Sequence, residues 1–381
     1  MIVGIDASNI RHGGGVTHLV EVLRAARPEA AGISQVIVWA GATTLRRIED
    51  RPWLVKSHLA VLDKNAFFRR ALWQRFSLTT QARAARCDVL FVPGGSYAGS
   101  FRPVVSMSRN LLPFEWTELA RFGWSWLAVK LCLLRLAQTA TLRHADGVIF
   151  LTRYAREVVT RAIGSASGKE VIIPHGIDDR FTRPPKRQLP IGQYSVDRPL
   201  RLLYVSIVDM YKHQWQVAEA VSELRKNGIP VALNLVGPAY PPALRRLTAA
   251  LNRVDPAGRF IHYAGAVPHA ELHTQYAGAD VCVFASSCEN MPNILLEGMA
   301  SGLPIACSKR GPMPEVLGDA GVYFDPESPA DIARALRALI DSPELREQLA
   351  QASSDRARIY SWNRCAGETF EFLAQVAASM P

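Results

Sequence analysis

Two glutamates, Glu289 and Glu297, are separated by seven residues and flank a short loop and the start of a helix. Carboxylates accept hydrogen bonds from hydroxyl groups, whereas free backbone N–H groups and the positive end of a helix suit a phosphate. A nucleotide sugar carries sugar hydroxyls, a diphosphate and ribose hydroxyls in that order. The spacing therefore predicts a nucleotide-sugar site, whose candidate donor-binding residues here are Asn290, Met291, Pro292, Asn293, Ile294, Leu295 and Glu297.

The elements around this pair favour a ligand site over the alternative of two solvated surface glutamates. The apolar run 281–285 predicts a buried parallel strand, and a helix is expected from near Pro292 to Gly302. Open α/β sheets bind ligands at such junctions, beyond the carboxyl ends of their strands. Eight helical steps would turn the two carboxylates about 80° apart. We therefore expect Glu289 in the loop and Glu297 on the helix.

This order of motifs resembles the donor-binding signature of retaining family 4 glycosyltransferases. The resemblance is carried by SxxE at 286–289 and NxxLEGMASGLP at 293–304, with GAVP at 265–268 before them and GPMPE at 311–315 after them. It implies an α/β chain with the GT-B architecture: two Rossmann-like domains facing across a deep cleft, and a C-terminal helix crossing back to the first domain. It also implies same-face sugar transfer, the leaving phosphate helping to deprotonate the acceptor. We expect no metal or other cofactor.

Lys212 and Glu289 are the candidate catalytic residues. Lys212 follows the predicted strand 202–206, where its amine could neutralise charge on a departing diphosphate. A solvated loop lysine is the alternative. We expect Glu289 to hold hydroxyls of the donor sugar and Glu297 to hold the ribose.

The chain departs from the resembled family at one cation. In that family an Arg precedes the Lys by a few residues, but here this position holds Ile207. The resemblance therefore implies that Lys212 acts alone or with help from Arg11 or Arg109.

The first half of the chain offers weaker candidates. Gly13–Gly15 precede a predicted helix from about Val16 to Ala26, and the resemblance implies that Gly14 and Gly15 approach the donor phosphate. A plain flexible turn is the alternative. Asn9 is expected in the same loop. Arg109 and Asn110 follow another predicted strand and are the remaining acceptor-side candidates, in a segment that lacks the His that many relatives carry.

Alternating strands and helices predict two parallel sheets, each covered on both faces. We expect an acceptor-side domain over residues 1–182, a Pro-rich linker over 183–200, a donor-binding domain over 201–358 and a C-terminal helical segment over 359–381. Predicted strands lie at 2–5, 35–40, 88–92, 104–107 and 147–151 in the first half, and at 202–206, 231–236, 260–263, 280–285 and 304–308 in the second.

Composition indicates a globular protein, because 49% of the 381 residues are hydrophobic and 20% are charged. Six cysteines without a CxxC pair indicate reduced thiols, and the first residues run directly into a strand pattern without resembling a signal peptide. No apolar run is long enough for a membrane span. HExxH and DxD-type metal motifs are absent from the sequence, as is any nucleic-acid-binding motif. A cytoplasmic protein is expected.

The net charge of +10 is concentrated in the first half, where residues 1–190 hold 27 Lys and Arg against 14 Asp and Glu. Two stretches combine arginines with aromatic residues, one over 67–76 and one over 116–135, which includes Trp116, Phe122, Trp124, Trp126, Lys130, Leu131, Leu134 and Arg135. Such stretches suit an anionic bilayer surface. Core aromatics beside solvated arginines are an equal alternative.

The sequence thus predicts a metal-independent, retaining glycosyltransferase of the hexosyltransferase class, acting in polysaccharide biosynthesis. Its partners are expected to be a nucleotide sugar and a hydroxyl acceptor, such as a lipid-linked or O-antigen precursor, at the inner face of the cell membrane. Two alternatives remain open: an epimerase-like nucleotide-sugar enzyme, and a non-catalytic subunit that binds sugar nucleotides.

Overall fold

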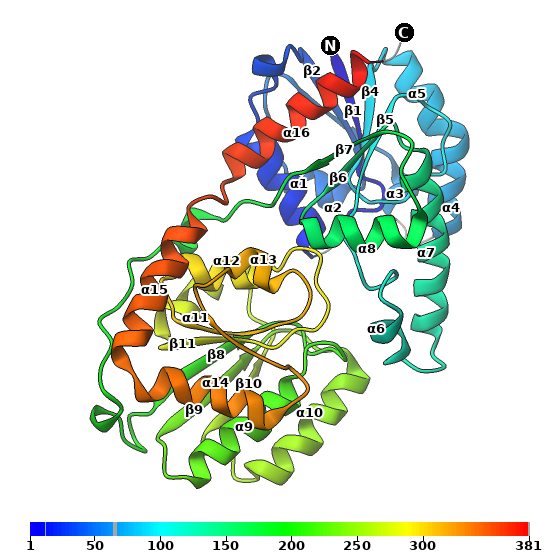
Figure 1. The fold of residues 1–381 in the computed structure, drawn as a ribbon. Coiled ribbons are helices and arrows are strands. Elements are labelled where there is room, and N and C mark those ends of the chain that lie inside the picture. Colours follow the sequence, from blue (N-terminus) through cyan, green and yellow to red (C-terminus); the bar gives the residue numbers. More distant parts are fainter. Residues whose placement is uncertain (12, 64–66, 380–381) are drawn as a thin grey trace. The chain divides into compact units, whose positions relative to one another are not determined.

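The computed structural model describes residues 1–11, 13–63 and 67–379 and contains two compact units (Figure 1). The first unit comprises Met1–Leu119, Gly123–Gly176 and Tyr360–Pro381, and the second comprises Ala120–Phe122 and Ile177–Ile359. None of the described helices is both long and apolar enough to cross a membrane.

The first unit is built on a parallel sheet in the order β3-β2-β1-β4-β5-β6-β7. Its strands are β1 (Ile2–Asp6), β2 (Gln35–Ala40), β3 (Leu54–His58), β4 (Val89–Val92), β5 (Val104–Met107), β6 (Gly147–Phe150) and β7 (Lys169–Ile172). Every residue of β4, β5 and β6 is buried. Continuous apolar strands of this kind are typical of a parallel sheet with helices on both faces.

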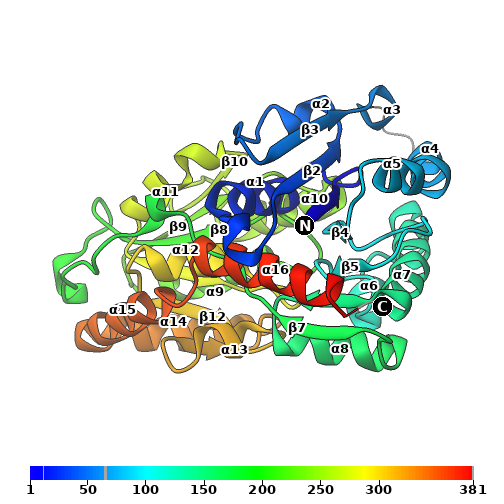
Figure 2. The ribbon, with the colours of Figure 1, turned by 90° about the horizontal axis from the view of Figure 1, so that it is seen from above.

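The helices of the first unit connect these strands. They are α1 (Gly14–Ala25), η1 (Pro28–Ala31), α2 (Ala42–Leu45), α3 (Ala60–Asp63), α4 (Phe67–Trp73), η2 (Gln74–Leu78), α5 (Thr79–Ala84), α6 (Trp116–Ala120), α7 (Trp126–His144) and α8 (Arg153–Ile163). The last helix, α16 (Trp362–Ala377), also belongs to this unit and packs against α1, η1 and β4 (Figure 2). The Ser361 hydroxyl caps α16 by accepting a hydrogen bond from the Arg364 N–H at 3.2 Å.

The second unit repeats the design with a six-stranded parallel sheet in the order β10-β9-β8-β11-β12-β13. The strands are β8 (Leu200–Val205), β9 (Val231–Val236), β10 (Ile261–Gly265), β11 (Val281–Phe284), β12 (Ile305–Ser308) and β13 (Val322–Phe324). Its helices are η3 (Asp179–Phe181), η4 (Ile191–Gln193), α9 (Gln214–Lys226), α10 (Pro241–Val254), η5 (His269–Glu271), α11 (Leu272–Gly278), α12 (Asn293–Ala300), α13 (Met313–Leu317), α14 (Pro329–Asp341) and α15 (Pro343–Ala357).

Each sheet reverses its winding at one point, between β1 and β4 in the first unit and between β8 and β11 in the second. Loops that leave the carboxyl ends of the two strands at such a point diverge to opposite faces of the sheet and leave a crevice. These two switch points are therefore where a ligand is expected in each unit.

All ten strands predicted from the sequence are present, within a residue or two of the expected bounds. Three further strands, β3, β7 and β13, were not predicted, and each lies at an edge of its sheet. None of the residues of β3 or β7 is fully buried. Edge strands need no continuous apolar run, so the pattern that reveals central strands is missing there.

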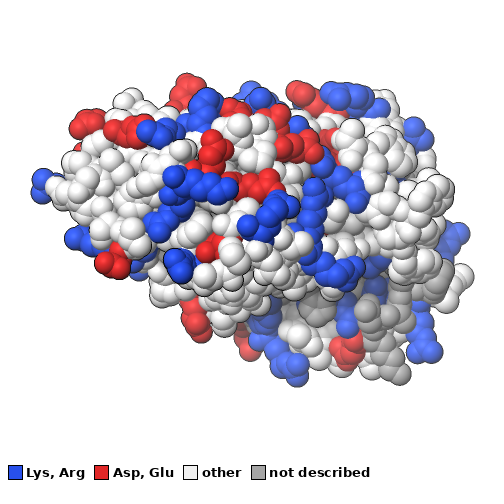
Figure 3. All heavy atoms as spheres, turned by 90° about the horizontal axis from the view of Figure 1, so that it is seen from below, with Lys and Arg blue, Asp and Glu red and all other residues white. Residues whose placement is uncertain are grey.

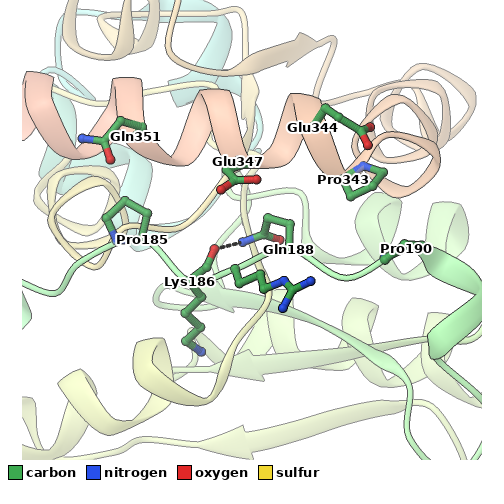
Figure 4. A pocket seen from close by; sticks show the side chains of 9 residues that line it. Pro185, Lys186, Gln188, Pro190, Pro343, Glu344, Glu347 and Gln351 are labelled. Atoms are coloured by element: carbon green, nitrogen blue, oxygen red, sulfur yellow. Dashed lines mark hydrogen bonds between the residues drawn. The ribbon is translucent and has the colours of Figure 1, made fainter.

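The segment predicted as a linker packs onto the second unit. The Lys186 amine donates to the carbonyls of Ala277 and Ala279, the latter at 2.9 Å, and the buried Arg346 of α15 donates to Gln188 Oε1 at 3.1 Å. A cavity of about 590 Å³ lies between this segment and α15, and the Lys186 amine points away from that helix (Figure 4). None of the predicted donor-binding residues lines this cavity.

Candidate functional site

The switch point of the second sheet brings together the two candidate catalytic side chains. Lys212 follows β8, Glu289 follows β11, and the Lys212 amine forms an ion pair with Glu289 Oε1. The Lys212 side chain is 5% exposed and that of Glu289 is 16% exposed. Residues 77 positions apart in sequence thus form one charged pair at the carboxyl ends of adjacent strands.

The surroundings of Lys212 hold its amine in place. The buried Tyr204 hydroxyl donates to the Lys212 carbonyl at 2.7 Å, which fixes the backbone. The amine also lies 5.1 Å from the ring centroid of Tyr211 and 5.4 Å from that of Phe284, both within the range of cation–π attraction. A buried lysine needs such compensation, because desolvation disfavours its charged form.

Glu297 lies on α12, as the sequence predicted, and Glu289 lies in the loop before this helix. The Tyr276 hydroxyl lies 3.1 Å from Glu297 Oε2, and His269 Nε2 lies 3.4 Å from Glu297 Oε1. Each carboxylate oxygen therefore has one polar neighbour from the α11 region. The hydrogen bond with Glu297 raises the pKa of His269.

A close contact between α12 and β11 accompanies the burial of the Glu297 side chain. A Cβ at Gly298 would lie 2.9 Å from Cys282 Sγ in β11, so α12 can approach the strand this closely only with glycine here. The approach leaves the Glu297 side chain 12% exposed. Its carboxylate is thus partly desolvated, which strengthens any hydrogen bond that it accepts.

At the start of α12, some backbone N–H groups are absent or already bonded, so they are not available to a phosphate. Pro292 has no N–H and provides no side-chain cap. The N–H of Asn293 donates to the Met291 carbonyl at 3.0 Å, and that of Leu295 donates to the Pro292 carbonyl at 2.9 Å. Of the residues from 291 to 295, Met291 and Ile294 are therefore the better backbone donors for a ligand.

Three further residues of this site were not among the predicted catalytic or donor-binding residues. Tyr276 and His269 contact Glu297, and His213 binds Ser287 across the switch point, with His213 Nε2 2.9 Å from Ser287 Oγ. His213 is completely buried and caps α9 with a left-handed backbone, at a φ of 53°. Burial lowers its pKa to about 4. A lone His or Tyr in sequence gives no signal of such contacts, because each joins segments distant in the chain.

The first unit places its candidates around its own switch point. Asn9 follows β1, its amide nitrogen lies 3.4 Å from the carbonyl oxygen of Ser96 beyond β4, and its Oδ1 accepts from Arg70 at 3.3 Å. Gly14 and Gly15 begin α1. His12 lies outside the described residues.

Arg109 and Asn110 follow β5 but differ in their surroundings. The Arg109 guanidinium lies beside Gly15, whereas Asn110 is exposed. Asn110 Oδ1 accepts a hydrogen bond from the Leu112 N–H at 3.1 Å, so this side chain closes a local turn.

Two family models match the chain in tandem. The model described as "Glycosyltransferase Family 4" matches residues 12–181, and the one described as "Glycosyl transferases group 1" matches residues 199–342. Together the two ranges take in well over half of the chain.

Curated relatives align over part of their length. The O-antigen chain mannosyltransferase B of Escherichia coli is 33% identical over 29% of this chain and 29% of that protein. The GDP-mannose-dependent alpha-(1-6)-phosphatidylinositol monomannoside mannosyltransferase of Mycolicibacterium smegmatis is 30% identical over 58% of this chain and 59% of that protein. The chain thus covers less than two thirds of either relative.

Solved structures align over the whole chain. Sucrose-phosphate synthase from Thermosynechococcus elongatus has a TM-score of 0.75 at 18% identity, with all of both chains covered. HepE from Anabaena in complex with UDP-glucose has a TM-score of 0.67 at 16% identity, also with full coverage of both chains. At these identities the likeness establishes the fold. With its two matched domains and two parallel sheets, the chain belongs to the family 4 glycosyltransferases and has the GT-B fold.

Proposed function

We propose that this protein is a retaining glycosyltransferase that moves a sugar from a nucleotide-diphosphate sugar to a hydroxyl acceptor. The observation that supports this proposal most strongly is the grouping of Lys212, Glu289 and Glu297 at the switch point of the second sheet. One cation and two carboxylates lie near the start of a helix. The cation and the helix start suit the diphosphate of the donor, and the two carboxylates suit its sugar and ribose hydroxyls.

Each side chain has a proposed role. Glu297 accepts hydrogen bonds from the ribose hydroxyls, and Glu289 accepts them from the donor sugar. The Lys212 amine, with the N–H groups of Met291 and Ile294, stabilises the diphosphate. Because Lys212 is already paired with Glu289, the ligand enters a site whose charges are preorganised, and little reorganisation is needed as charge develops.

The proposed reaction breaks the bond between the anomeric carbon and the phosphate oxygen and forms a bond from the acceptor oxygen on the same face of the sugar. The acceptor proton passes to the departing phosphate, so that a nucleoside diphosphate is released. No divalent metal is required in this proposal, since Lys212 neutralises part of the leaving charge. Among the described residues, no group of three or more His, Cys, Asp and Glu could hold a metal ion.

The nucleotide is proposed to be a uridine or guanosine diphosphate. HepE was solved with UDP-glucose, and one relative is named for its dependence on GDP-mannose. These names describe those proteins, and they define the two donor classes to be tried first here.

The proposal is tested by incubating purified protein with UDP-glucose or GDP-mannose and a panel of hydroxyl acceptors, with and without EDTA. NMR of the product should show the anomeric configuration of the donor, and EDTA should leave the rate unchanged. An inverted product would contradict retention. An epimerase-like enzyme would change the donor without any acceptor, and a non-catalytic subunit would bind a donor without turnover; either outcome would overturn the proposal.

We also propose that the acceptor is a lipid-linked or polysaccharide precursor and that the first unit contacts an anionic bilayer peripherally. Exposed apolar side chains gather on α4, η2, α6 and α7 and in the segment just before α7. The helices α4, α6 and α7 lie along one flank in the two views (Figures 1 and 2). They are Leu72, Phe76, Trp116, Trp124, Trp126, Val129, Leu133 and Leu136. In α7 they recur every three or four residues, which places them on one helical face.

The structure corrects part of the sequence prediction for this surface. Phe122 and Leu131 were expected on it but are buried, whereas Val129 and Leu133 are exposed. The side chains of Phe67 and Phe68 lie outside the described residues. The spacing of apolar residues along a helix identifies its apolar faces. It does not show which of two such faces packs against the sheet, and this is why some residues were predicted on the wrong face.

The membrane contact is tested by co-sedimentation with vesicles of anionic phosphatidylglycerol or neutral phosphatidylcholine. The protein should sediment with the anionic vesicles, and the double substitution Trp126→Ser with Leu133→Ser should release it. The matched control is Ile359→Ser, which changes an exposed apolar residue of the second unit. Equal sedimentation of all three proteins would contradict the contact.

A further inference from the structure

His213 follows Lys212 directly in the chain and links two loops of the second unit. Its ring nitrogen Nε2 lies 2.9 Å from Ser287 Oγ, and Ser287 stands two residues before Glu289. Lys212 and His213 come from the loop after β8, whereas Ser287 and Glu289 come from the loop after β11. The contact between His213 and Ser287 therefore joins the same two loops as the ion pair between Lys212 and Glu289.

The direction of this hydrogen bond follows from the Ser287 hydroxyl. Ser287 Oγ donates to the Tyr211 carbonyl at 3.3 Å, and the Ser287 N–H donates to the same carbonyl at 2.9 Å. Because a hydroxyl has one proton to donate, Ser287 Oγ is left to accept from the Nε2–H of His213. Ser287 thus bonds to both chain neighbours of Lys212, which are Tyr211 and His213.

The His213 imidazole is buried and neutral. Its side chain is completely buried, and its Nδ1 has no hydrogen-bond partner among the described residues. Burial is the main cause that lowers the pKa of His213 to about 4. At neutral pH the ring therefore bonds to Ser287 as an uncharged donor and places no second positive charge beside the Lys212 amine.

The backbone of His213 is in an unfavourable conformation. Its φ of 53° lies in the left-handed region, where residues other than glycine are uncommon and persist only where the surrounding structure holds them. The side chain makes no capping hydrogen bond to α9 in return. What this residue supplies in its place is the bond to Ser287, and strained positions of this kind cluster at functional sites.

The other bonds of the Lys212 backbone stay within its own part of the chain. The Lys212 carbonyl accepts from the Tyr204 hydroxyl at 2.7 Å, and the Lys212 N–H donates to the Asp209 carbonyl at 3.1 Å. Neither of these bonds reaches the loop after β11. The bond from His213 to Ser287 does reach it, so it helps to set the distance between the backbones from which the amine and its partner carboxylate extend.

We propose that His213 is a positioning residue for the reaction, which through Ser287 holds the Lys212 amine beside the departing diphosphate. The inference rests on the proposed function, because there Lys212 is the group that neutralises the leaving charge. A charge that is already in place lowers the barrier, since it does not have to move as negative charge develops. Loss of the link should therefore slow the reaction even though the amine is still present.

Two amide substitutions separate the link from the backbone conformation. His213→Gln carries an amide N–H about as far out as Nε2, whereas His213→Asn carries one only as far as Nδ1 and is too short for Ser287. Asn is nevertheless the better of the two in a left-handed backbone. If the link matters, His213→Gln should resemble the parent more closely than His213→Asn does. If only the backbone mattered, the order would be reversed.

The hold on the Lys212 amine is measured without any substrate. Acetic anhydride acylates accessible amines, and mass spectrometry compares Lys212, whose side chain is 5% exposed, with the exposed Lys226 in the same folded sample. His213→Asn should raise the relative acylation of Lys212 by about threefold or more, because a loop without its link opens more often, whereas His213→Gln should stay within about twofold of the parent. Unchanged acylation in both variants, or a larger rise in His213→Gln, would overturn the inference.

A change in the opposite loop gives a second route if His213→Asn fails to fold. Ser287→Ala removes the acceptor and leaves His213 in place, so it should raise the acylation of Lys212 to a similar extent. The matched control is Ser222→Ala, which removes another buried hydroxyl of the second unit, one that donates to the Val254 carbonyl at 3.3 Å. Equal acylation of Lys212 in the two serine variants would contradict the link.

Kinetics then test the positioning role in the active enzyme. His213→Asn should lower kcat at saturating donor about fivefold and leave the donor KM nearly unchanged, whereas His213→Gln should keep kcat within about twofold. A kcat unaffected by His213→Asn, in an enzyme that Lys212→Ala does slow, would overturn the role. If the parent has no transferase activity, the proposed function fails, and the acylation ratios alone decide whether His213 holds the amine.

Discussion

The two sheets share one winding pattern but carry opposite electrostatic arrangements at their switch points. In the second unit, Lys212 is paired with Glu289, and Glu297 lies against His269 and Tyr276. In the first unit, Arg109 lies at a helix start with no carboxylate partner among the described residues. The same topology therefore supports a site with balanced charges in one unit and an excess of positive charge in the other.

The difference extends to the sequence as a whole. Residues 1–190 carry a net charge of +13, whereas the remainder carries −3. Figure 3 shows acidic and basic side chains interspersed over the face that it presents. At the second switch point, a bound anion replaces a carboxylate that already pairs with the cation. At the first switch point, a bound anion adds a charged partner to a cation that has no carboxylate partner among the described residues. Binding at the first switch point should thus be the more sensitive to added salt.

The largest expected effect on the reaction rate comes from breaking the balanced pair. Lys212→Ala should lower kcat at saturating donor at least tenfold, about 1.4 kcal/mol of transition-state stabilisation. The substitution also leaves Glu289 partly buried without its partner, so the double variant Lys212→Ala with Glu289→Gln removes both charges as a check on stability. It should be no faster than Lys212→Ala. The exposed Lys226→Ala is the control, and a Lys212→Ala rate within twofold of it would refute the role of Lys212.

Removing the second carboxylate should act on binding rather than on rate. Glu297→Ala is expected to weaken nucleoside diphosphate binding about tenfold to a hundredfold, because hydrogen bonds to a charged group contribute about 1.5–3 kcal/mol. Tyr276→Phe removes one neutral donor to Glu297 and should cost less, about fivefold. Calorimetry measures both, with the exposed Glu271→Ala as control. An unchanged dissociation constant for Glu297→Ala would show that the ribose binds elsewhere.

Acid should destabilise the folded protein, because His213 is buried at the second switch point and must stay neutral there. The pKa of His213 is lowered by burial to about 4, so the folded protein holds it neutral while the unfolded chain binds a proton below its ordinary value of 6.5. Its contribution is complete above pH 6.5 and is lost as pH falls toward 4, by about 1.4 kcal/mol per pH unit.

His213→Asn tests this directly, since Asn tolerates the left-handed backbone and does not titrate. The variant should be less stable than the parent at neutral pH, and the gap should narrow steadily between pH 6.5 and 4 in urea unfolding. The exposed His262→Asn should show no such change. A constant gap across this range would rule out titration of His213 as the cause.

The smallest effect is expected at His269. Here stability is lost as pH rises, whereas at His213 it is lost as pH falls. Its pKa is raised by the hydrogen bond with Glu297, so its stabilising contribution is complete below pH 6.5 and is lost as pH rises through the folded value. The side chain is 42% exposed, and solvent screening should limit the contribution to about 0.5 kcal/mol. Comparing unfolding of the parent with His269→Ala from pH 6 to 8 should show the gap closing; a widening gap would contradict this sign.

The sequence predicted the local structure around Glu289 and Glu297 better than the arrangement around Arg109, because the elements that carry the two glutamates are consecutive in the chain. The apolar strand 281–284, the loop with Glu289 and the helix with Glu297 are contiguous, so the residue pattern alone indicates their order. The contacts of Tyr276 and His269 with Glu297 were not predicted, since both residues lie well upstream of it in the chain and meet it only through tertiary packing. In the first unit, no motif signalled that Arg109 would lie against Gly15, because β1 and β5 are not even neighbours in the sheet.

The most direct test of the central claim is a crystal structure with an intact nucleotide sugar or its nucleoside diphosphate. The account predicts the ribose hydroxyls within hydrogen-bond distance of the Glu297 carboxylate and the phosphates at the Lys212 amine and the N–H groups of Met291 and Ile294. A bound nucleotide whose ribose lies away from Glu297, with its phosphates contacting neither Lys212 nor the start of α12, would contradict it.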